Sequence, residues 1–361
     1  MKTLRLILDS RGLAGSFAAG DVPSPIEQAA RILKSGGLVA FPTETVYGLG
    51  ANALDRAAVE GIFRAKQRPA WDPVIVHVAP LDRRQSMLEV LVEEIPETAR
   101  LLIEAFWPGP LTLLLPRRRE VPDAVTAGRP LVGVRMPAHP AALALIRRAE
   151  VPVAAPSANR FGHTSPTTAA HVLDDLDGRI DAVLDAGPTE HGVESTVLDP
   201  TQSPMVIYRP GAVTAGQIRA VAGPVELFRE PAAPAPEPKE SLPAPGVGLR
   251  HYAPCAQLIL IEADAEDGAA GLAASMAAEA RKYSGKKLGI MLPEGIDMRE
   301  EFNGAQVLRW GRWESPEAMA RELYAGLRRL DGDACQVILC PLPPEQGIGA
   351  AIRDRLRKAA R

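Results

Sequence analysis

A proline-rich stretch divides the chain into two parts. Residues 230–241 read EPAAPAPEPKES, and two more prolines follow soon after. Proline fixes φ and lacks a backbone N–H donor, so this composition cannot build a helix or a central strand. The 361 residues are enough for two domains. We therefore predict a first domain over residues 1–222, a linker over 223–254 and a second domain over 255–361.

The composition describes a globular protein. Hydrophobic residues make up 46% of the chain and charged residues 24%, which is enough apolar material to bury cores. The formal net charge of -3 lacks the basic field of most duplex-binding proteins. The three cysteines form no C-x-x-C pair, which disfavours disulfides and zinc and fits a reducing cytosol. No run reaches the roughly 18 apolar residues of a membrane helix, so we expect a soluble, cytoplasmic protein without membrane contact.

In the first part, short apolar runs alternate with helical patterns. Strands are expected in the opening MKTLRLILDS and over residues 38–42, 74–78, 111–115, 131–135, 151–155, 181–185, 193–198 and 205–209. Helices are expected over residues 25–35, 55–66, 96–106, 138–149, 166–174 and 214–221. Some strands follow each other directly and others are separated by helices, which predicts an α/β domain with a mixed twisted sheet.

The second part has a more regular pattern. Strands are expected over residues 257–262, 286–292, 306–310 and 336–341. Helices are expected over residues 265–282, 315–330 and 347–359. Strands and helices that alternate in this way predict a small parallel, Rossmann-like three-layer α/β domain.

The stretch FPTETVYGLG, residues 41–50, puts polar groups where a strand should end. Pro42 is expected to end the strand, and Gly48 and Gly50 are expected to turn the backbone sharply. Hydroxyl groups would then gather at a strand end, where open α/β sheets bind ligands. A capping turn into a helix that starts near Asp55 is an equal alternative.

Two cations leave a predicted helix end on a rigid loop. Lys66 and Arg68 lie in AKQRPAWDP, where two prolines stiffen the exit. Such a pair suits a polyphosphate, although cations at a helix C-terminus commonly only offset the helix dipole. His77 lies inside an apolar strand, which by itself is typical of a core histidine. Arg135 ends another strand, where it can bind a carboxylate or form an internal salt bridge.

Polar residues gather at further strand ends. They are Ser157, Asn159, His163, Thr164 and Ser165 in PSANRFGHTSPT, Ser195 and Thr196 in ESTV, and Arg209 in YRPG. The chain carries no P-loop, no G-x-S-x-G and no Cys/His nucleophile pattern, and its six histidines lack metal-site spacing. This combination predicts a site that binds and aligns anionic groups, with no metal held by the protein.

Six motifs in this order resemble the YrdC/Sua family of threonylcarbamoyl-AMP synthases. They are FPTETVYGLG, KQRPAWDP, GVRMP, PSANRFGHTSPT, ESTV and YRPG, spread over residues 30–213. The family's K-x-R and S-x-N hallmarks begin here at Lys66 and Ser157. The ending GIGAAIRDRLRKAA resembles the longer, Sua-type members. The resemblance implies a YrdC-like open twisted sheet with a concave, positively lined cavity, followed by a Sua-type C-terminal domain.

The resemblance also implies an activity. Members of the family are nucleotidyltransferases that make L-threonylcarbamoyladenylate and pyrophosphate from L-threonine, bicarbonate and ATP. The product feeds the N6-threonylcarbamoyl modification of the tRNA adenosine next to the anticodon. Mg²⁺ is expected to arrive with ATP, bound mainly by phosphates and water. A downstream threonylcarbamoyl transferase complex is the implied partner, and contact with tRNA is expected to be indirect.

Site residues follow from the matched motifs. The implied L-threonine site consists of Thr45, His77, Arg135 and Ser195. The implied ATP site consists of Lys66, Arg68, Asp72, Ser157, Asn159, Ser165 and Arg209, of which Lys66 and Arg68 are also assigned to catalysis. Asp72 stands where the family pattern has Asn, and a carboxylate repels a triphosphate unless it contacts Mg²⁺ or the ribose. His251 and Tyr252, in a family-like linker segment with Ala244 and Val247 substituted, are expected to act as a lid.

Two other functions stay open at this point. A carbamoyl-adenylate-forming enzyme that uses carbamoyl phosphate shares the core motifs, but such chains bring an acylphosphatase-like part and C-x-x-C zinc motifs that this sequence lacks. A non-catalytic RNA-binding module could use the same cations, although the net charge of -3 argues against it.

Overall fold

The computed structural model of the chain describes residues 2–8, 24–80, 86–229, 241–247, 251–262, 268–296 and 304–361. Their contacts divide the chain into two units. The first unit comprises Met1–Phe161, Ser165–Glu190 and Glu194–Gly248, and the second comprises Gly162–Thr164, His191–Val193 and Leu249–Arg361. A strand at Val225–Leu227 and the segment 241–247 lie within the range predicted as linker and belong to the first unit.

The first unit is built on one sheet of eleven strands. They are β1 (Leu4–Ile7), β2 (Val39–Pro42), β3 (Tyr47–Asn52), β4 (Ile75–His77), β5 (Leu111–Pro116), β6 (Leu131–Arg135), β7 (Val153–Ala154), β8 (Ala182–Asp185), β9 (Thr196–Asp199), β10 (Met205–Arg209) and β11 (Val225–Leu227). Their order across the sheet is β1-β8-β2-β3-β7-β4-β6-β5-β9-β10-β11. The sheet contains both parallel pairs, such as β4 and β6, and antiparallel pairs, such as β5 and β6. The predicted mixed sheet is confirmed.

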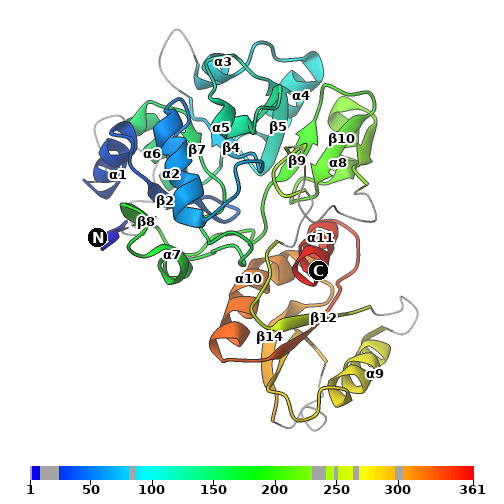
Figure 1. Ribbon diagram of the computed structural model, residues 1–361. Helices are drawn as coiled ribbons and strands as arrows, with labels where there is room; N and C mark the ends of the chain where they lie inside the picture. Colours follow the sequence, from blue (N-terminus) through cyan, green and yellow to red (C-terminus); the bar gives the residue numbers. More distant parts are fainter. Residues whose placement is uncertain are drawn as a thin grey trace. The chain divides into compact units, whose positions relative to one another are not determined.

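Eight helices of the described chain belong to the first unit (Figure 1). They are α1 (Ser24–Lys34), α2 (Arg56–Lys66), α3 (Met87–Leu91), α4 (Glu97–Phe106), α5 (Asp123–Thr126), α6 (Pro140–Ala149), α7 (Ala169–Leu176) and α8 (Ala215–Ala222). Local sequence sets their ends. Asp55 caps α2, with its side chain accepting from the N–H groups of Ala57 and Ala58, and Pro140 opens α6 at a position where its missing N–H costs nothing. The short helices α3 and α5 were not predicted.

The two faces of the central strands have different surroundings. Side chains alternate between faces along a strand. Val76 and Val134 point into the large core formed with the helices. Their neighbours on the opposite face, Ile75 and Leu114, form a smaller apolar cluster with Ala244, from the segment before the second unit. Part of that face is therefore shielded from water by residues 241–247.

The second unit contains a fully parallel sheet. Its strands are β12 (Gln257–Ile261), β13 (Leu288–Glu294), β14 (Gln306–Arg312) and β15 (Val337–Pro341), in the order β12-β15-β13-β14. Its helices are α9 (Gly268–Arg281), α10 (Pro316–Gly332) and α11 (Gly349–Ala359). Within this unit, α9 lies on one side of the sheet, and α10 and α11 lie together on the other (Figure 1). The predicted three-layer α/β arrangement is confirmed.

The stretch FPTETVYGLG folds differently from its prediction. Pro42 ends β2 as expected, but the chain turns over Thr43–Val46 and returns as β3, antiparallel to β2. Gly48 and Gly50 lie inside β3 rather than in a turn. A Cβ on Gly50 would come within 2.8 Å of the Phe41 ring and 2.9 Å of Val153. These glycines therefore allow close packing of β3, which the sequence pattern alone did not distinguish from a turn.

No helix in the described parts of the chain is both long and apolar enough to cross a membrane.

Candidate active site

Polar side chains form a row across one face of the central strands. His77 on β4 is in register with Arg135 on β6. The antiparallel register of β5 and β6 sets Thr112 opposite Arg135. Thr112 Oγ1 is 2.8 Å from Ser195 Oγ, and Ser195 accepts a hydrogen bond from Arg209. The row thus contains three residues that were predicted to bind L-threonine and one that was predicted to bind ATP. The first three are His77, Arg135 and Ser195, and the fourth is Arg209.

A β-bulge places Arg209 in this row. Ile207 on β10 points into the large core, and simple alternation would send Arg209 to the same side. The register of β10 against β9 shifts between Ile207 and Arg209, so that Arg209 pairs with Val197 instead. Val197 belongs to the apolar cluster on the opposite face. The extra residue therefore redirects the guanidinium to the polar row, as bulges beside functional sites often do.

Arg135 is held by three groups. Its Nη2 forms a 2.6 Å ion pair with Glu44 Oε1, in which both side chains are 3% exposed. Its Nη1 donates to Thr45 Oγ1 at 3.0 Å, and its Nε donates to the carbonyl of Gly109 at 3.1 Å. Burial raises the pKa of Glu44, but the charge and hydrogen bonding of Arg135 outweigh this, and the pKa lies below its ordinary value. The pair is therefore ionised at neutral pH and fixes the guanidinium plane.

His77 is buried next to this pair. Its ring meets Phe41 edge-on, with 6.1 Å between ring centroids. Burial, with the positive charge of Arg135, lowers the pKa of His77 to about 3. Within the described chain, its Nδ1 has no hydrogen-bond partner. The imidazole is therefore neutral at physiological pH and retains a nitrogen that can bind a ligand.

Lys66 connects α2 to the S-x-N motif. The side chain is 1% exposed, and its ammonium donates to the carbonyls of Ser157, at 2.6 Å, and Asn159, at 2.5 Å. The Asn159 amide donates to the carbonyl of Arg160. The two hallmark motifs therefore meet in space, and one buried cation sets the path of the loop.

Arg68 and Asp72 form a second buried ion pair. Arg68 Nη2 lies 2.9 Å from Asp72 Oδ1, with side-chain exposures of 7% and 0%. Burial raises the pKa of Asp72, although the charges of Arg68, Lys66 and Arg209 oppose that shift. Asp72 thus lies within the field of all three cations that the sequence assigned to ATP.

Ser165 ends the S-x-N loop at another carboxylate. Its hydroxyl donates to Glu194 Oε1 at 2.5 Å, and the side chain is fully buried. Glu194 directly precedes Ser195, so this contact ties the loop to the polar row. The described residues contain no group of three or more His, Cys, Asp or Glu arranged to hold a metal ion.

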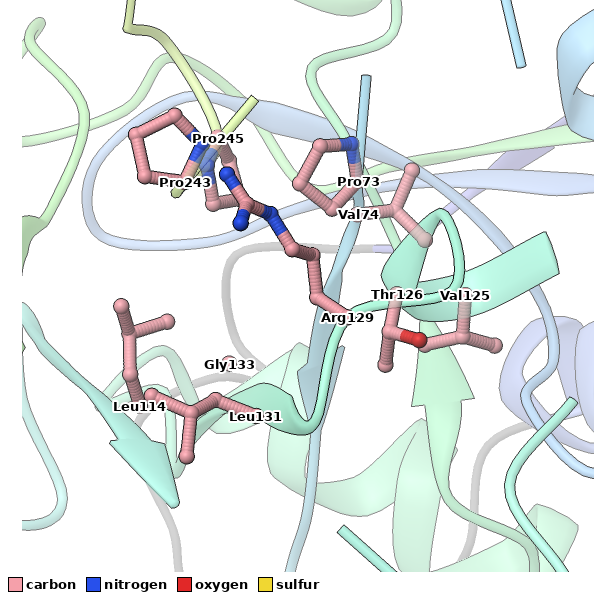
Figure 2. A pocket seen from close by; sticks show the side chains of 10 residues that line it. All are labelled: Pro73, Val74, Leu114, Val125, Thr126, Arg129, Leu131, Gly133, Pro243 and Pro245. Carbon is pink, nitrogen blue, oxygen red and sulfur yellow. The ribbon is translucent and has the colours of Figure 1, made fainter. Parts of the chain in front are cut away.

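A small pocket lies beside Pro73, the residue that follows Asp72 (Figure 2). Its lining residues are Pro73, Val74, Leu114, Val125, Thr126, Arg129, Leu131, Gly133, Pro243 and Pro245. Arg129 extends towards Pro243 and Pro245 (Figure 2) and donates to the carbonyl of Leu242 at 3.2 Å. The Thr126 hydroxyl is buried and has no hydrogen-bond partner in the described chain. The walls are thus mostly apolar, with few polar groups.

The two predicted lid residues belong to the second unit. The ring of Tyr252 stacks on Tyr324, with 5.9 Å between centroids, and the Arg355 guanidinium lies 5.3 Å from its centroid. Tyr252 adopts a left-handed φ of 63°, and the His251 ring lies 5.4 Å from it. A lid function for the two residues stays a prediction.

Comparisons with known proteins cover the whole chain. Residues 31–211 match the Sua5/YciO/YrdC family, described as "Telomere recombination", and residues 213–361 match the threonylcarbamoyl-AMP synthase C-terminal domain. Threonylcarbamoyl-AMP synthase from Pyrococcus abyssi is 44% identical over 337 residues, which cover 93% of this chain and 94% of the relative. The chain belongs to the threonylcarbamoyl-AMP synthase family.

Further relatives agree with this membership. The Bacillus subtilis threonylcarbamoyl-AMP synthase is 42% identical over 364 residues, covering 100% of this chain and 98% of the relative. A crystal structure of P. abyssi Sua5 complexed with L-threonine has a TM-score of 0.85 and 40% identity, covering 100% of this chain and 98% of that one. Like its relatives, this threonylcarbamoyl-AMP synthase family member is an enzyme, a nucleotidyltransferase of tRNA modification, as the sequence predicted.

Three polar residues of this family member's site were missed in the sequence. Glu44 lies within the first motif, and Glu194 lies just before Ser195 in ESTV. Thr112 is the one polar residue in the strand sequence LTLLLP of β5. The available signals were a carboxylate within a motif and a hydroxyl within an apolar strand. They do not show that Glu44 pairs with Arg135 or that Thr112 contacts Ser195, because the partners are distant in sequence.

Proposed function

We propose that this chain makes threonylcarbamoyl-AMP and pyrophosphate from L-threonine, bicarbonate and ATP. In this reaction the threonine amine takes up CO₂ to form a carbamate. A carbamate oxygen then attacks the α-phosphorus of ATP, forming a P–O bond while pyrophosphate leaves. The product would serve the N6-threonylcarbamoyl modification of tRNA through a downstream transferase complex.

The single observation that carries the proposal is the polar row with its fixed cations. Arg135 and Arg209 lie on one sheet face, linked through Thr112 and Ser195. Arg209, Lys66 and Arg68 all lie near enough to Asp72 for their charges to lower its pKa. A carbamate and a triphosphate repel each other, so the main task of the enzyme is to align two anions and exclude water. Fixed cations on a shielded sheet face suit this task better than a nucleophile would.

L-Threonine would bind at the Arg135 end of the row. Arg135 is already oriented by Glu44 and Thr45, which suits a bidentate contact with the amino acid carboxylate. His77 is neutral and offers a buried ring nitrogen for the substrate's polar groups. Ser195 would complete this subsite from the neighbouring strand.

ATP would bind at the other end of the row. Lys66, Arg68 and Arg209 would hold the phosphates, with Ser157, Asn159 and Ser165 shaping the loop around them. The nucleoside would lie near Pro73, because Arg68 Nη2 donates to the carbonyl of that residue. Mg²⁺ would enter with ATP and supply charge neutralisation at the phosphates. Its ligands would be phosphate oxygens and water.

We also propose a role for each of the three parts of the chain. Residues 1–222 would form the catalytic domain, 223–254 a linker with a lid, and 255–361 the Sua-type C-terminal domain. The lid test is to change His251 and Tyr252 to Ala together. A lid that shields the carbamate predicts that ATP breakdown continues while product formation falls. Unchanged coupling of the two would rule the lid out.

The reaction is tested by pyrophosphate release from MgATP with single components left out. We expect release to require both L-threonine and bicarbonate, and serine to replace threonine poorly. Release that ignores both, or that appears only with carbamoyl phosphate, would instead indicate carbamoyl-adenylate chemistry. No release together with salt-sensitive RNA binding would indicate a binding module.

A further inference from the structure

A buried carboxylate lies among the cations that we assign to the phosphates of ATP. Asp72 is fully buried, and its Oδ1 is 2.9 Å from Nη2 of Arg68. Arg68 also donates from Nε to the backbone carbonyl of Asp72, at 3.2 Å, and from Nη2 to the carbonyl of Pro73, at 2.7 Å. The guanidinium is therefore oriented by acceptors of one short loop between two prolines.

Charged groups from three places act on Asp72. Arg68 comes from the same loop, Lys66 from the end of α2, and Arg209 from the bulged end of β10. Burial raises the pKa of Asp72 above its ordinary value, and these three cations only partly offset that rise. A carboxylate that is 0% exposed is costly to keep ionised, so the charge of Asp72 depends on such cations.

We propose that Asp72 is an internal counter-ion of the phosphate-binding cations, and that the phosphates of MgATP displace it from Arg68. The inference rests on the proposed ATP-binding function. Once a phosphate takes over Arg68, Asp72 is a buried carboxylate next to an anion. Burial and like charge both favour its protonated form. MgATP binding therefore takes up a proton at Asp72 and strengthens as the pH falls.

This role differs from that of a direct ATP ligand. Asp72 acts through Arg68, as a positioning residue that keeps the guanidinium in place before the nucleotide arrives. It also sets an electrostatic cost, because the incoming phosphate must compete with a carboxylate for the same guanidinium. If Asp72 were a direct ligand, neutralising its side chain would weaken MgATP binding. If Asp72 is a displaced counter-ion, neutralising it would strengthen MgATP binding.

Isothermal titration calorimetry of the full-length chain with MgATP tests this difference. Measurements in two buffers of different ionisation enthalpy count the protons taken up, with an upper limit of about one for a single group. We expect Asp72→Asn to take up fewer protons than the wild type and to bind MgATP several-fold tighter at alkaline pH. ATP itself also takes up or releases protons, and it does so equally with both proteins. The contribution of Asp72 is therefore the difference in proton uptake between the wild type and Asp72→Asn.

Asp185→Asn is the matched control. Asp185 pairs with Arg5 at 2.7 Å on the edge of the sheet, so its neutralisation should leave proton uptake as in the wild type. Equal uptake by the wild type and Asp72→Asn, or weaker binding by Asp72→Asn, overturns the inference. If Asp72→Asn does not fold, wild-type affinity that fails to strengthen at lower pH overturns it as well. If the wild type binds no MgATP at all, the proposed function is refuted as well.

Discussion

Glu44 and Arg135 form a 2.6 Å ion pair in which each side chain is only 3% exposed. Removing ions from water is costly, so a buried pair is weak evidence of a contribution to stability. The same contact fixes a guanidinium at a sheet position where the substrate carboxylate is proposed to bind. We therefore infer that the pair serves to orient the guanidinium of Arg135.

Glu44→Gln should impair the use of L-threonine. The amide cannot neutralise Arg135, so the guanidinium loses the ion pair that helps to orient it, while the side-chain volume is kept and the contacts with Thr45 and Gly109 remain. We expect KM for L-threonine to rise about tenfold, equivalent to about 1.4 kcal/mol, with MgATP affinity nearly unchanged. Steady-state pyrophosphate release measures both. Glu27→Gln is the control, because Glu27 pairs with Arg31 and Arg148 at the surface, where ion pairs contribute little; a similar rise in the control would contradict the assignment.

His77 makes the stability of the fold depend on pH. Its folded-state pKa of about 3 lies below the model-compound value of 6.5. Between these values the unfolded chain binds the extra proton, so stability is present above pH 6.5 and is lost as the pH falls towards 3. From pH 7 to pH 5 this loss amounts to about 2 kcal/mol. Urea unfolding of the wild type and His77→Gln at both pH values should show the larger loss in the wild type, because His139, whose pKa burial also lowers, still contributes a loss in the variant; equal losses would refute the role of His77.

Lys66→Met should weaken both the fold and MgATP binding. The carbonyls of Ser157 and Asn159 lose their buried donor, which costs about 1–3 kcal/mol. The cation proposed for the phosphates is lost as well. Unfolding curves and calorimetry measure the two effects. Lys34→Met is the control, because Lys34 pairs with Glu150 at an exposed site; full MgATP affinity in Lys66→Met would remove Lys66 from the proposed ATP site.

Gly50→Ala should destabilise the first unit. The added Cβ would lie 2.8 Å from Phe41 and 2.9 Å from Val153, and overpacking of this kind costs about 1–3 kcal/mol. Gly216→Ala is a matched control in α8, where the nearest atom is 3.9 Å away and alanine favours the helix by up to about 1 kcal/mol. Thermal unfolding should therefore shift in opposite directions for the two variants. A stabilised Gly50→Ala would contradict the packing argument.

Much of the fold could be predicted from the sequence because apolar periodicity sets strands and helices. All four strands of the second unit were predicted, since their apolar runs alternate with well-formed helical patterns. The hairpin of β2 and β3 was not, because Gly48 and Gly50 are equally typical of turns and of tightly packed strands. Only the position of Phe41 and Val153 decides between the two.

The candidate site was predictable residue by residue but not as an arrangement. Motifs identified Arg135, Ser195 and Arg209, whereas their connection through Thr112 depends on strand order. The bulge that turns Arg209 towards Ser195 leaves no mark in YRPG. The carboxylates Glu44 and Asp72 became interpretable only once their arginine partners were known. Charge pairing is a property of the folded chain, so a linear pattern cannot assign it.

The proposed reaction is tested most directly by following ¹³C-labelled bicarbonate into the product. The purified chain would be incubated with MgATP, L-threonine and labelled bicarbonate, and the products separated and weighed by mass spectrometry. We expect an adenylate that contains threonine and carries the ¹³C label, formed together with pyrophosphate. Unlabelled AMP as the only adenylate, or ADP and phosphate in place of pyrophosphate, would contradict it.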